Sequence, residues 1–266
     1  MDGNTNKSEP SGKPTVMPGI LLASISLPGI FANFFAIVIT LRILKIKAHR
    51  LSPNVFVLGL TCIDLVAVLG ISFPSFLYYT AGRWLGGVPM CKFQGFIALF
   101  SSLASGGVAV AMAVERLLSV LWPIKYRGVT NSKTRAWKIV LAIVTGTATL
   151  SFLPLGGIGG FVKNLSGSFC TFDWFAKDIE DVVYSYVIIV YSVIMVIALL
   201  FCNIIVIIKL YQQTKKRRSL SVRTATLSSS KENSLEWQFG RMMVVISCVF
   251  LLCWTPFMVS SLLLFS

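Results

Sequence analysis

The sequence predicts an all-α membrane protein, a bundle of helices that crosses the bilayer six times. Of its 266 residues, 55% are hydrophobic and 13% are charged, whereas an ordinary soluble domain has about 25% charged residues. The chain also contains six apolar stretches, each near or above the ~20 residues that a crossing needs. A polar tail at 1–19 precedes them and a polar loop at 211–237 separates the last two; the stretches are 20–43, 54–79, 90–121, 136–155, 182–210 and 239–265.

The third stretch, residues 90–121, is expected to be the central helix. No charged residue lies between Phe93 and Val114. A helix from Cys91 to Arg116 would be roughly 37 Å long at about 1.5 Å per residue, which exceeds the ~30 Å hydrocarbon layer, so a tilted helix is expected. The small residues at 104–107 would let neighbouring helices approach closely.

The placement of charge predicts the topology. The chain has 24 basic and 10 acidic residues, a net charge of +14, which as a total could indicate a nucleic-acid-binding protein. The basic residues instead gather in short segments after the first, third and fifth stretches, the pattern of cytoplasmic loops. We therefore expect no nucleic-acid partner, a multi-pass protein of the plasma membrane and an extracellular N-terminus. The basic segments contain Arg42, Lys45, Lys47 and Arg50; Lys125, Arg127, Lys133, Arg135 and Lys138; and Lys209, Lys215, Lys216, Arg217, Arg218, Arg223, Lys231 and Arg241.

Two further features agree with this orientation. Asn6 and Asn164 begin N-x-[ST] sequons, and both fall on the predicted external side, where glycosylation takes place. Cys91 and Cys170 are the cysteines predicted to lie outside the bilayer on that oxidising side.

The remaining cysteines and the single histidine do not indicate metal chemistry. Four cysteines lie in apolar stretches, where small core residues are expected: Cys62, Cys202, Cys248 and Cys253. His49 is the one histidine, so a metal centre has few available ligands. We expect no metal and no cofactor.

Asp64 and the pair Glu115-Arg116 are the charged residues of greatest interest. Asp64 lies deep in the second stretch, and a carboxylate in hydrocarbon is costly enough that it should face the bundle interior and have a function there. A purely structural contact, with Asn33 of the first stretch, is the alternative. Glu115 and Arg116 lie at a helix end, where a solvated or lipid-facing pair is also expected.

Prolines are expected to kink several of the helices. Pro74, Pro154 and Pro256 each remove a backbone hydrogen bond within an apolar stretch. Trp254 lies just before Pro256, so the sixth helix could pivot at this point.

Together these features resemble the rhodopsin-like G-protein-coupled receptors. The matches are Asn33, LTCID at 60–64, Cys91, Glu115-Arg116 and CWTP at 253–256. Within that class, runs such as SPNVFVLGLTCIDL, GRWLGGVPMCKF and MAVERLLSV resemble prostanoid receptors, especially the prostaglandin E type. The resemblance implies a rhodopsin-like helix bundle with six of the seven transmembrane helices present, and a chain truncated before the seventh.

The resemblance also implies a ligand and a partner. The ligand would be a prostaglandin-like lipid acid, and Tyr79 and Ser168 match positions that contact its carboxylate. Arg116 matches the residue that engages a heterotrimeric G protein. Asp64 and Ser105, with Asn33 nearby, match part of a sodium pocket.

Two contacts are expected on this basis. Cys91 and Cys170, as the external cysteines, are expected to form a disulfide. Glu236 lies far enough before Pro256 to reach the cytoplasmic face, and an inactive-state ion pair with Arg116 is expected, with a solvated Glu236 as the alternative.

Several other functions remain open or are disfavoured. A six-helix channel or transporter is disfavoured because no stretch carries regularly spaced arginines and no selectivity-filter sequence lies between the fifth and sixth stretches. An intramembrane enzyme is disfavoured because one deep acid and one histidine assemble neither a dyad nor a metal site. A non-signalling six-helix product that modulates a full-length receptor stays open. In the prostanoid receptors that this chain resembles, the seventh helix carries the arginine that pairs with the ligand carboxylate. The chain alone is therefore not expected to signal.

Overall fold

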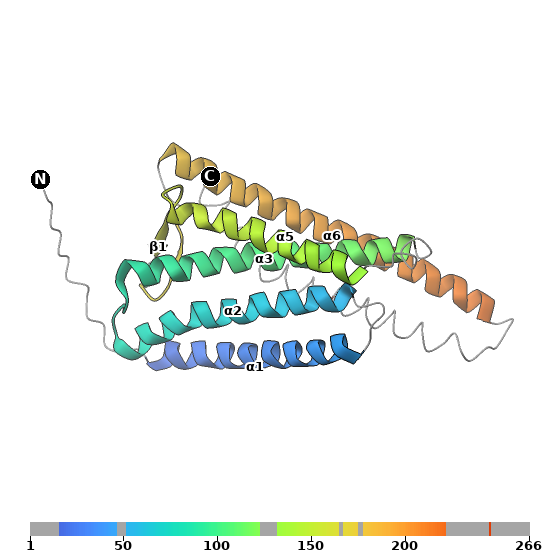
Figure 1. The fold of residues 1–266 in the computed structure, drawn as a ribbon, viewed down its shortest axis with the longest axis horizontal. Helices are drawn as coiled ribbons and strands as arrows, with labels where there is room; N and C mark the ends of the chain where they lie inside the picture. Colours follow the sequence, from blue (N-terminus) through green and yellow to red (C-terminus); the bar gives the residue numbers. More distant parts are fainter. Residues whose placement is uncertain are drawn as a thin grey trace, which may run out of the picture.

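The computed structural model describes residues 16–46, 52–122, 132–164, 167–174, 178–221 and residue 245. Five long helices lie side by side in alternating directions, with a two-stranded hairpin at one end (Figure 1). Each of the five is long and apolar enough to cross a membrane. The elements are α1 (Val16–Ile46), α2 (Ser52–Ala81), α3 (Gly87–Leu121), α5 (Ser132–Phe152), the 3₁₀ turn η1 (Leu153–Leu155), β1 (Phe161–Lys163), β2 (Cys170–Phe172) and α6 (Ile179–Ser221).

Two helices are longer than the apolar stretches that predicted them. α1 begins at Val16, inside the expected tail 1–19, and α6 continues to Ser221, so the first part of the expected loop 211–237 is helical. Residues 211–221 contain glutamine, lysine and arginine and no glycine or proline, a composition that favours helix outside the bilayer as well as inside it. The sixth expected stretch, 239–265, lies outside the described residues except for Val245.

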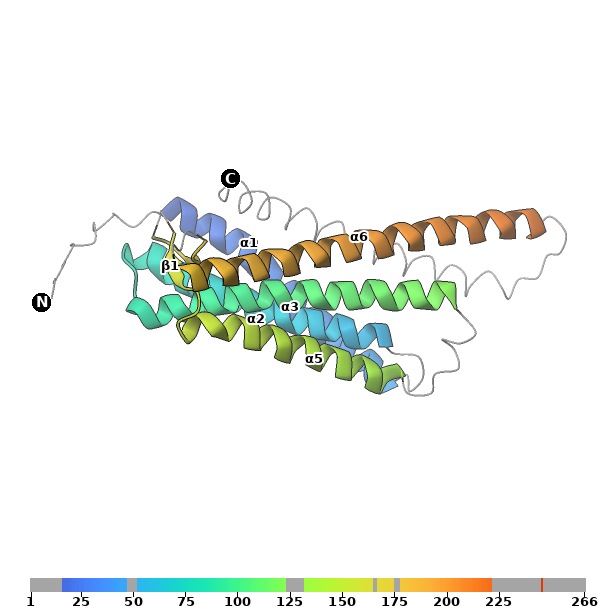
Figure 2. The same ribbon diagram turned by 90° about the horizontal axis from the view of Figure 1, so that it is seen from above.

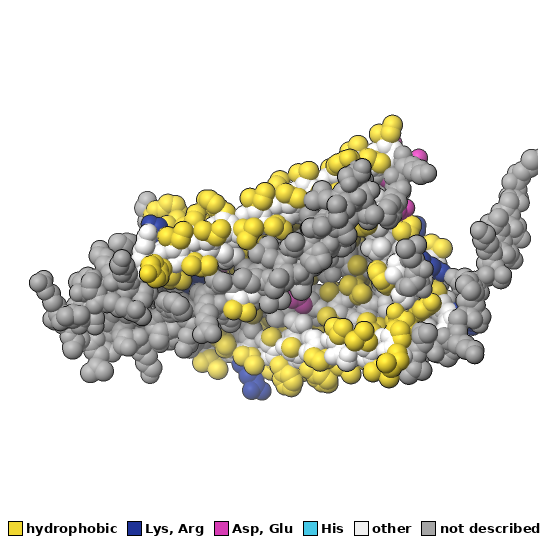
Figure 3. Space-filling view, turned by 180° about the vertical axis from the view of Figure 1, so that it is seen from behind, with side chains coloured by type: hydrophobic (Ala, Val, Ile, Leu, Met, Phe, Trp, Pro, Cys, Tyr) yellow, Lys and Arg dark blue, Asp and Glu magenta, His cyan; other side chains and the backbone are white. Residues whose placement is uncertain are grey.

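α3 is the central helix of the bundle. It packs against α2, α5, α6 and both strands, and Figure 2 shows it between α6 on one side and α2 and α5 on the other. In its most apolar window 61% of the residues are buried, against 6% for α1. Hydrophobic side chains cover most of the described surface in view (Figure 3), as expected where lipid replaces water.

Glycines allow the helices to approach closely. A Cβ atom added to Gly59 of α2 would lie 2.9 Å from a methyl group of Val140, and one added to Gly107 of α3 would lie 2.8 Å from a methyl group of Ile143. Both contacts involve α5, so missing side chains on α2 and α3 make room for it. The largest cluster of buried hydrophobic residues lies where these three helices meet. It contains Val55, Phe56, Ile63, Ala104, Val108, Met112, Ala136 and Val140.

The hairpin β1–β2 was not predicted from the sequence. Its strands are antiparallel, with Phe161 opposite Phe172 and Lys163 opposite Cys170. It lies at the end of the bundle where α1, α3 and α6 begin and α2 and α5 end, here called the hairpin end (Figure 1). Pro154 lies in η1, where it ends α5, whereas Pro74 lies inside a continuous α2.

One side-chain expectation was wrong. Cys62 is exposed on α2, although it was expected in the core, while Cys202 of α6 is buried. The exposed face of an outer helix is lipid-facing, so an apolar thiol is stable there without being packed.

Candidate ligand site

A disulfide joins the hairpin to the first turns of α3. Cys91 and Cys170 are bonded with an S–S distance of 2.06 Å and a Cα–Cα distance of 5.2 Å, although 79 residues separate them in the chain. Both cysteines are buried, at 6% and 1% exposure. The predicted pairing is therefore present, and it fixes β2 directly above the bundle.

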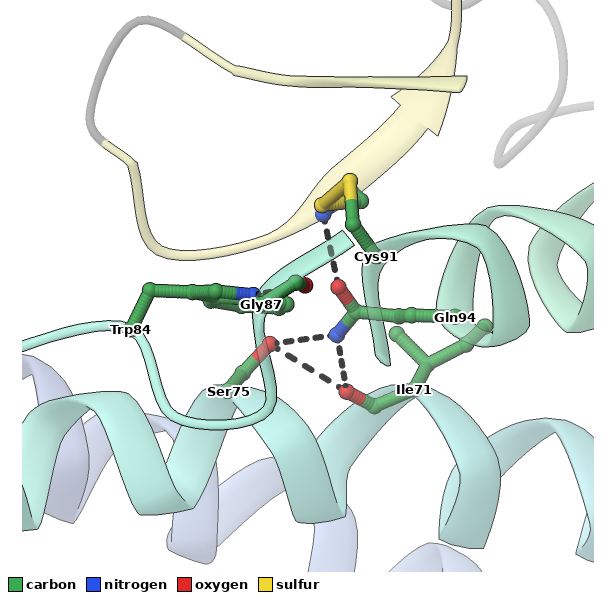
Figure 4. The surroundings of a disulfide bond; sticks show 7 residues. Ile71, Ser75, Trp84, Gly87, Cys91 and Gln94 are labelled. Carbon is green, nitrogen blue, oxygen red and sulfur yellow. Dashed lines mark hydrogen bonds between the residues drawn. A yellow bond between two sulfur atoms is a disulfide. The ribbon is translucent and has the colours of Figure 1, made fainter. Parts of the chain in front are cut away.

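Gln94 forms a buried hydrogen-bonding centre next to this disulfide (Figure 4). Its side chain is 0% exposed. The amide nitrogen donates to the carbonyl oxygen of Ile71 at 2.7 Å and to the hydroxyl of Ser75 at 2.9 Å. The amide oxygen accepts from the backbone N–H of Cys170 at 2.6 Å. One side chain thus connects α2, α3 and β2.

Trp84 lies in the loop between α2 and α3 and packs against the disulfide. It is 7% exposed and packs with both disulfide cysteines, Tyr78 and Met90. Its indole N–H donates to the carbonyl of Gly87 at 2.9 Å. The Nζ atom of Lys163, on β1, lies 5.8 Å from the centre of the Trp84 ring, within the range of a cation–π interaction.

Aromatic side chains seat the hairpin on the bundle. Phe172 is 3% exposed and packs with Tyr184 on Leu99 and Leu103 of α3. Its ring meets Trp174 at 4.8 Å and Tyr184 at 5.4 Å between centroids. The Tyr184 hydroxyl donates to the carbonyl of Leu150 at 2.8 Å, so the same cluster also connects α6 to α5. The hairpin consequently forms a packed lid over this end of the bundle.

The two residues expected to contact a ligand carboxylate have different surroundings. Ser168 lies in the hairpin loop and is 4% exposed. Tyr79 is half-buried and packs against α1, since a Cβ atom added to Gly19 would lie 3.3 Å from the Tyr79 Cβ atom. The neighbouring Tyr78 instead faces the loop: its hydroxyl would lie 3.8 Å from a Cβ atom added to Gly167.

Sequence reasoning selected Tyr79 and did not consider Tyr78, the tyrosine that lies next to the loop. Adjacent residues on a helix point about 100° apart, so a pair of tyrosines presents two faces, and the sequence does not say which one meets the loop. The two rings touch each other edge to face, 5.4 Å apart between centroids. Both tyrosines line the hairpin end of α2.

Polar residues of the bundle interior form a second group. The Ser105 hydroxyl of α3 donates to the carboxylate of Asp64 on α2 at 2.8 Å. The side chain of Asn33 donates to the carbonyl of Gly29 in its own helix at 2.9 Å. The structure thus brings Asp64 and Ser105 together and directs the Asn33 amide to the backbone of α1.

The residues expected at the G-protein side lie partly outside the described chain. Glu115 is 8% exposed and Arg116 is half-buried, near the end of α3 opposite the hairpin. Glu236, Trp254 and Pro256 lie outside the described residues, as does the sequon residue Asn6. Asn164 lies directly after β1, where its backbone N–H donates to the carbonyl of Phe169 at 3.0 Å. Within the described ranges, no group of three or more metal-ligating side chains comes together.

Comparison with known proteins identifies the family. The model of the 7 transmembrane receptor (rhodopsin family) matches residues 32–265. The human prostaglandin E2 receptor EP4 subtype is 27% identical over 210 residues, which cover 78% of this chain and 42% of that protein. A Gq-coupled rhodopsin of Mizuhopecten yessoensis is 21% identical over 251 residues, or 92% of this chain and 49% of that one. The chain thus spans less than half the length of these relatives.

The fold agrees with this assignment. The crystal structure of squid rhodopsin superimposes with a TM-score of 0.77 at 20% sequence identity, covering 92% of this chain and 70% of that chain. At this identity the likeness concerns the fold alone.

Proposed function

Because the chain belongs to the rhodopsin family of seven-transmembrane receptors, whose members are receptors and not enzymes, we propose that it is a G-protein-coupled receptor chain for a prostaglandin-like lipid acid. The observation that carries this proposal is the hairpin end itself. There a disulfide-linked lid buries Ser168 and faces Tyr78, while apolar and aromatic side chains form the surroundings. Such an end suits a ligand with a long apolar body and one polar group.

The polar group of such a ligand needs partners. A carboxylate moved from water into an apolar cleft costs several kcal/mol unless it is paired. The proposed hydrogen-bonding groups are the hydroxyls of Ser168, Tyr78 and Tyr79. Arg83 and Lys92 are exposed at the same end, where they would attract an acid from solution without enclosing it.

Neutral hydroxyls alone do not replace a charged partner. We propose that tight binding arises when a prostanoid-type seventh helix, with its arginine, completes the bundle, and that the 266-residue chain alone binds the acid weakly and does not activate a G protein. In the completed bundle, Arg116 at the opposite end would engage the G protein. We also propose that the receptor acts at the plasma membrane with the hairpin end outside.

Binding of a tritiated prostaglandin to cell membranes tests this function. One preparation contains the 266-residue chain, and a second contains the chain extended by a prostanoid-type seventh helix. We expect saturable binding in the second preparation, weakened roughly tenfold or more by methylation of the ligand carboxylate, since that removes a charge-assisted contact. Saturable submicromolar binding to the bare chain would show that the site does not need the seventh helix. Equal affinity for acid and ester would refute the proposed ligand class.

A further inference from the structure

Gln94 holds the free edge of strand β2. The hydrogen bonds from Asn164 N–H to Phe169 O, at 3.0 Å, and from Asp173 N–H to Gly160 O, at 2.8 Å, flank the ladder on either side. Because hydrogen-bonded and non-hydrogen-bonded pairs alternate in an antiparallel ladder, the pair Lys163–Cys170 is a non-hydrogen-bonded one. The N–H of Cys170 therefore points away from β1, and the Gln94 oxygen occupies the place that a third strand would take.

The same residue of β2 is thus attached twice to one face of α3. Cys91 and Gln94 are three residues apart, which places their side chains on the same face of a helix. Cys91 bonds the Cys170 side chain and Gln94 bonds the Cys170 backbone. A disulfide alone leaves the strand able to rotate about the bridge, whereas a second attachment through the backbone fixes its orientation.

The other half of the Gln94 amide holds α2 beside the position where Pro74 removes a backbone hydrogen bond. Ile71 and Ser75 flank Pro74, which has no N–H to donate to the preceding turn. Both partners of the Gln94 nitrogen belong to this turn. Tyr78 and Tyr79 follow Ser75 by three and four residues, on the next turn of the same helix.

We propose that Gln94 is a positioning residue that sets the distance between the hairpin loop carrying Ser168 and the turn of α2 carrying Tyr78 and Tyr79. Its effect on ligand affinity rests on the proposed function, but its effect on the hairpin does not. Gln94 touches no ligand group in this arrangement, since it is fully buried beneath β2. It acts through Cys170 and Ser75.

Hydrogen–deuterium exchange of the purified 266-residue chain tests the structural half. Gln94→Met keeps the volume and removes all three hydrogen bonds, so we expect the peptide that contains Cys170 to exchange about tenfold faster. Gln212→Met is the matched control, because Gln212 is exposed on α6, and it should leave this peptide unchanged. Ser75→Ala removes a single partner and should produce a smaller increase; it also supplies the measurement if Gln94→Met does not fold. Unchanged exchange of the Cys170 peptide in the folded Gln94→Met chain, or in the Ser75→Ala chain that replaces it, would overturn the proposal.

Prostaglandin binding to the chain extended by a seventh helix tests the functional half. We expect Gln94→Met to weaken Kd about tenfold while the number of binding sites stays within about twofold of the unsubstituted chain. A loss of sites at unchanged Kd would show that Gln94 serves folding alone and would overturn the positioning role. If the unsubstituted extended chain binds no prostaglandin, the proposed ligand is wrong, and the exchange measurement still decides what Gln94 does to the hairpin.

Discussion

Asp64 and Gln94 are both polar side chains inside the bundle, yet the sequence drew attention to one of them. A carboxylate in an apolar stretch is conspicuous because of its cost in hydrocarbon, whereas a neutral amide is easily passed over. The structure gives both residues interhelical partners: Asp64 bonds Ser105 of α3, and Gln94 bonds Ile71 and Ser75 of α2. No charged residue lies between Phe93 and Val114. The polar amide of Gln94 within this apolar segment was the signal that could have identified it.

The Asp64–Ser105 hydrogen bond should contribute measurably to stability. We expect Ser105→Ala to destabilise the chain by about 1–2 kcal/mol, because it leaves a carboxylate oxygen without its donor. Ser102→Ala is the control: Ser102 lies on the same helix, and its hydroxyl has no hydrogen bond among the described residues. Thermal unfolding in detergent compares the two. Equal midpoints for both variants would show that the hydrogen bond is energetically neutral.

The length and hydropathy of the apolar stretches located the five long helices of the described chain, because a bilayer leaves the backbone no alternative to internal hydrogen bonding. The hairpin was not located, because strands of three residues are too short to show an alternating pattern. Its position depends on contacts far apart in the chain, such as that between Gln94 and Cys170, which are separated by 76 residues. The ends of α1 and α6 were misplaced because helix continues beyond the apolar residues.

The contact between the hairpin and α3 should be sensitive to one methyl group. A Cβ atom on Gly95 would lie 2.4 Å from Cδ1 and 3.0 Å from Cβ of Phe161, so Phe161 and the strand that carries it must move. We expect Gly95→Ala to destabilise the chain by about 1–3 kcal/mol, as overpacked cores do.

Gly146→Ala is the matched control for this substitution. Nothing lies within 4 Å of a Cβ atom added to Gly146 of α5, and alanine favours helix over glycine by roughly 0.5–1 kcal/mol. Thermal unfolding should therefore show a lower midpoint for Gly95→Ala and an unchanged or higher one for Gly146→Ala. A Gly95→Ala chain as stable as the control would mean that Phe161 does not anchor the hairpin.

At the scale of the whole molecule, charge separates the two ends of the bundle. Arg42 and Lys45 end α1, Lys133 and Arg135 begin α5, and Lys209 lies near the end of the apolar part of α6. The hairpin end carries both signs: Arg83, Lys92 and Lys163 are basic, and four acidic residues lie before and in the first turn of α6, namely Asp173, Asp178, Glu180 and Asp181. The fold explains this separation, because alternating helix directions bring loops that are distant in sequence to the same side of the membrane.

The whole-molecule prediction is that the hairpin end faces outward. Basic residues are retained on the cytoplasmic side, and the disulfide at the hairpin end requires the oxidising side. An epitope tag fused before Met1 should be stained by antibody on intact cells, whereas a tag inserted after residue 230 should be stained after permeabilisation only. Glycosidase should also shift the mass of the chain, and Asn164→Gln should remove part of that shift if the sequon after β1 is used. Staining of the second tag on intact cells, with the first one hidden, would reverse the topology and place the proposed ligand site on the wrong side of the membrane.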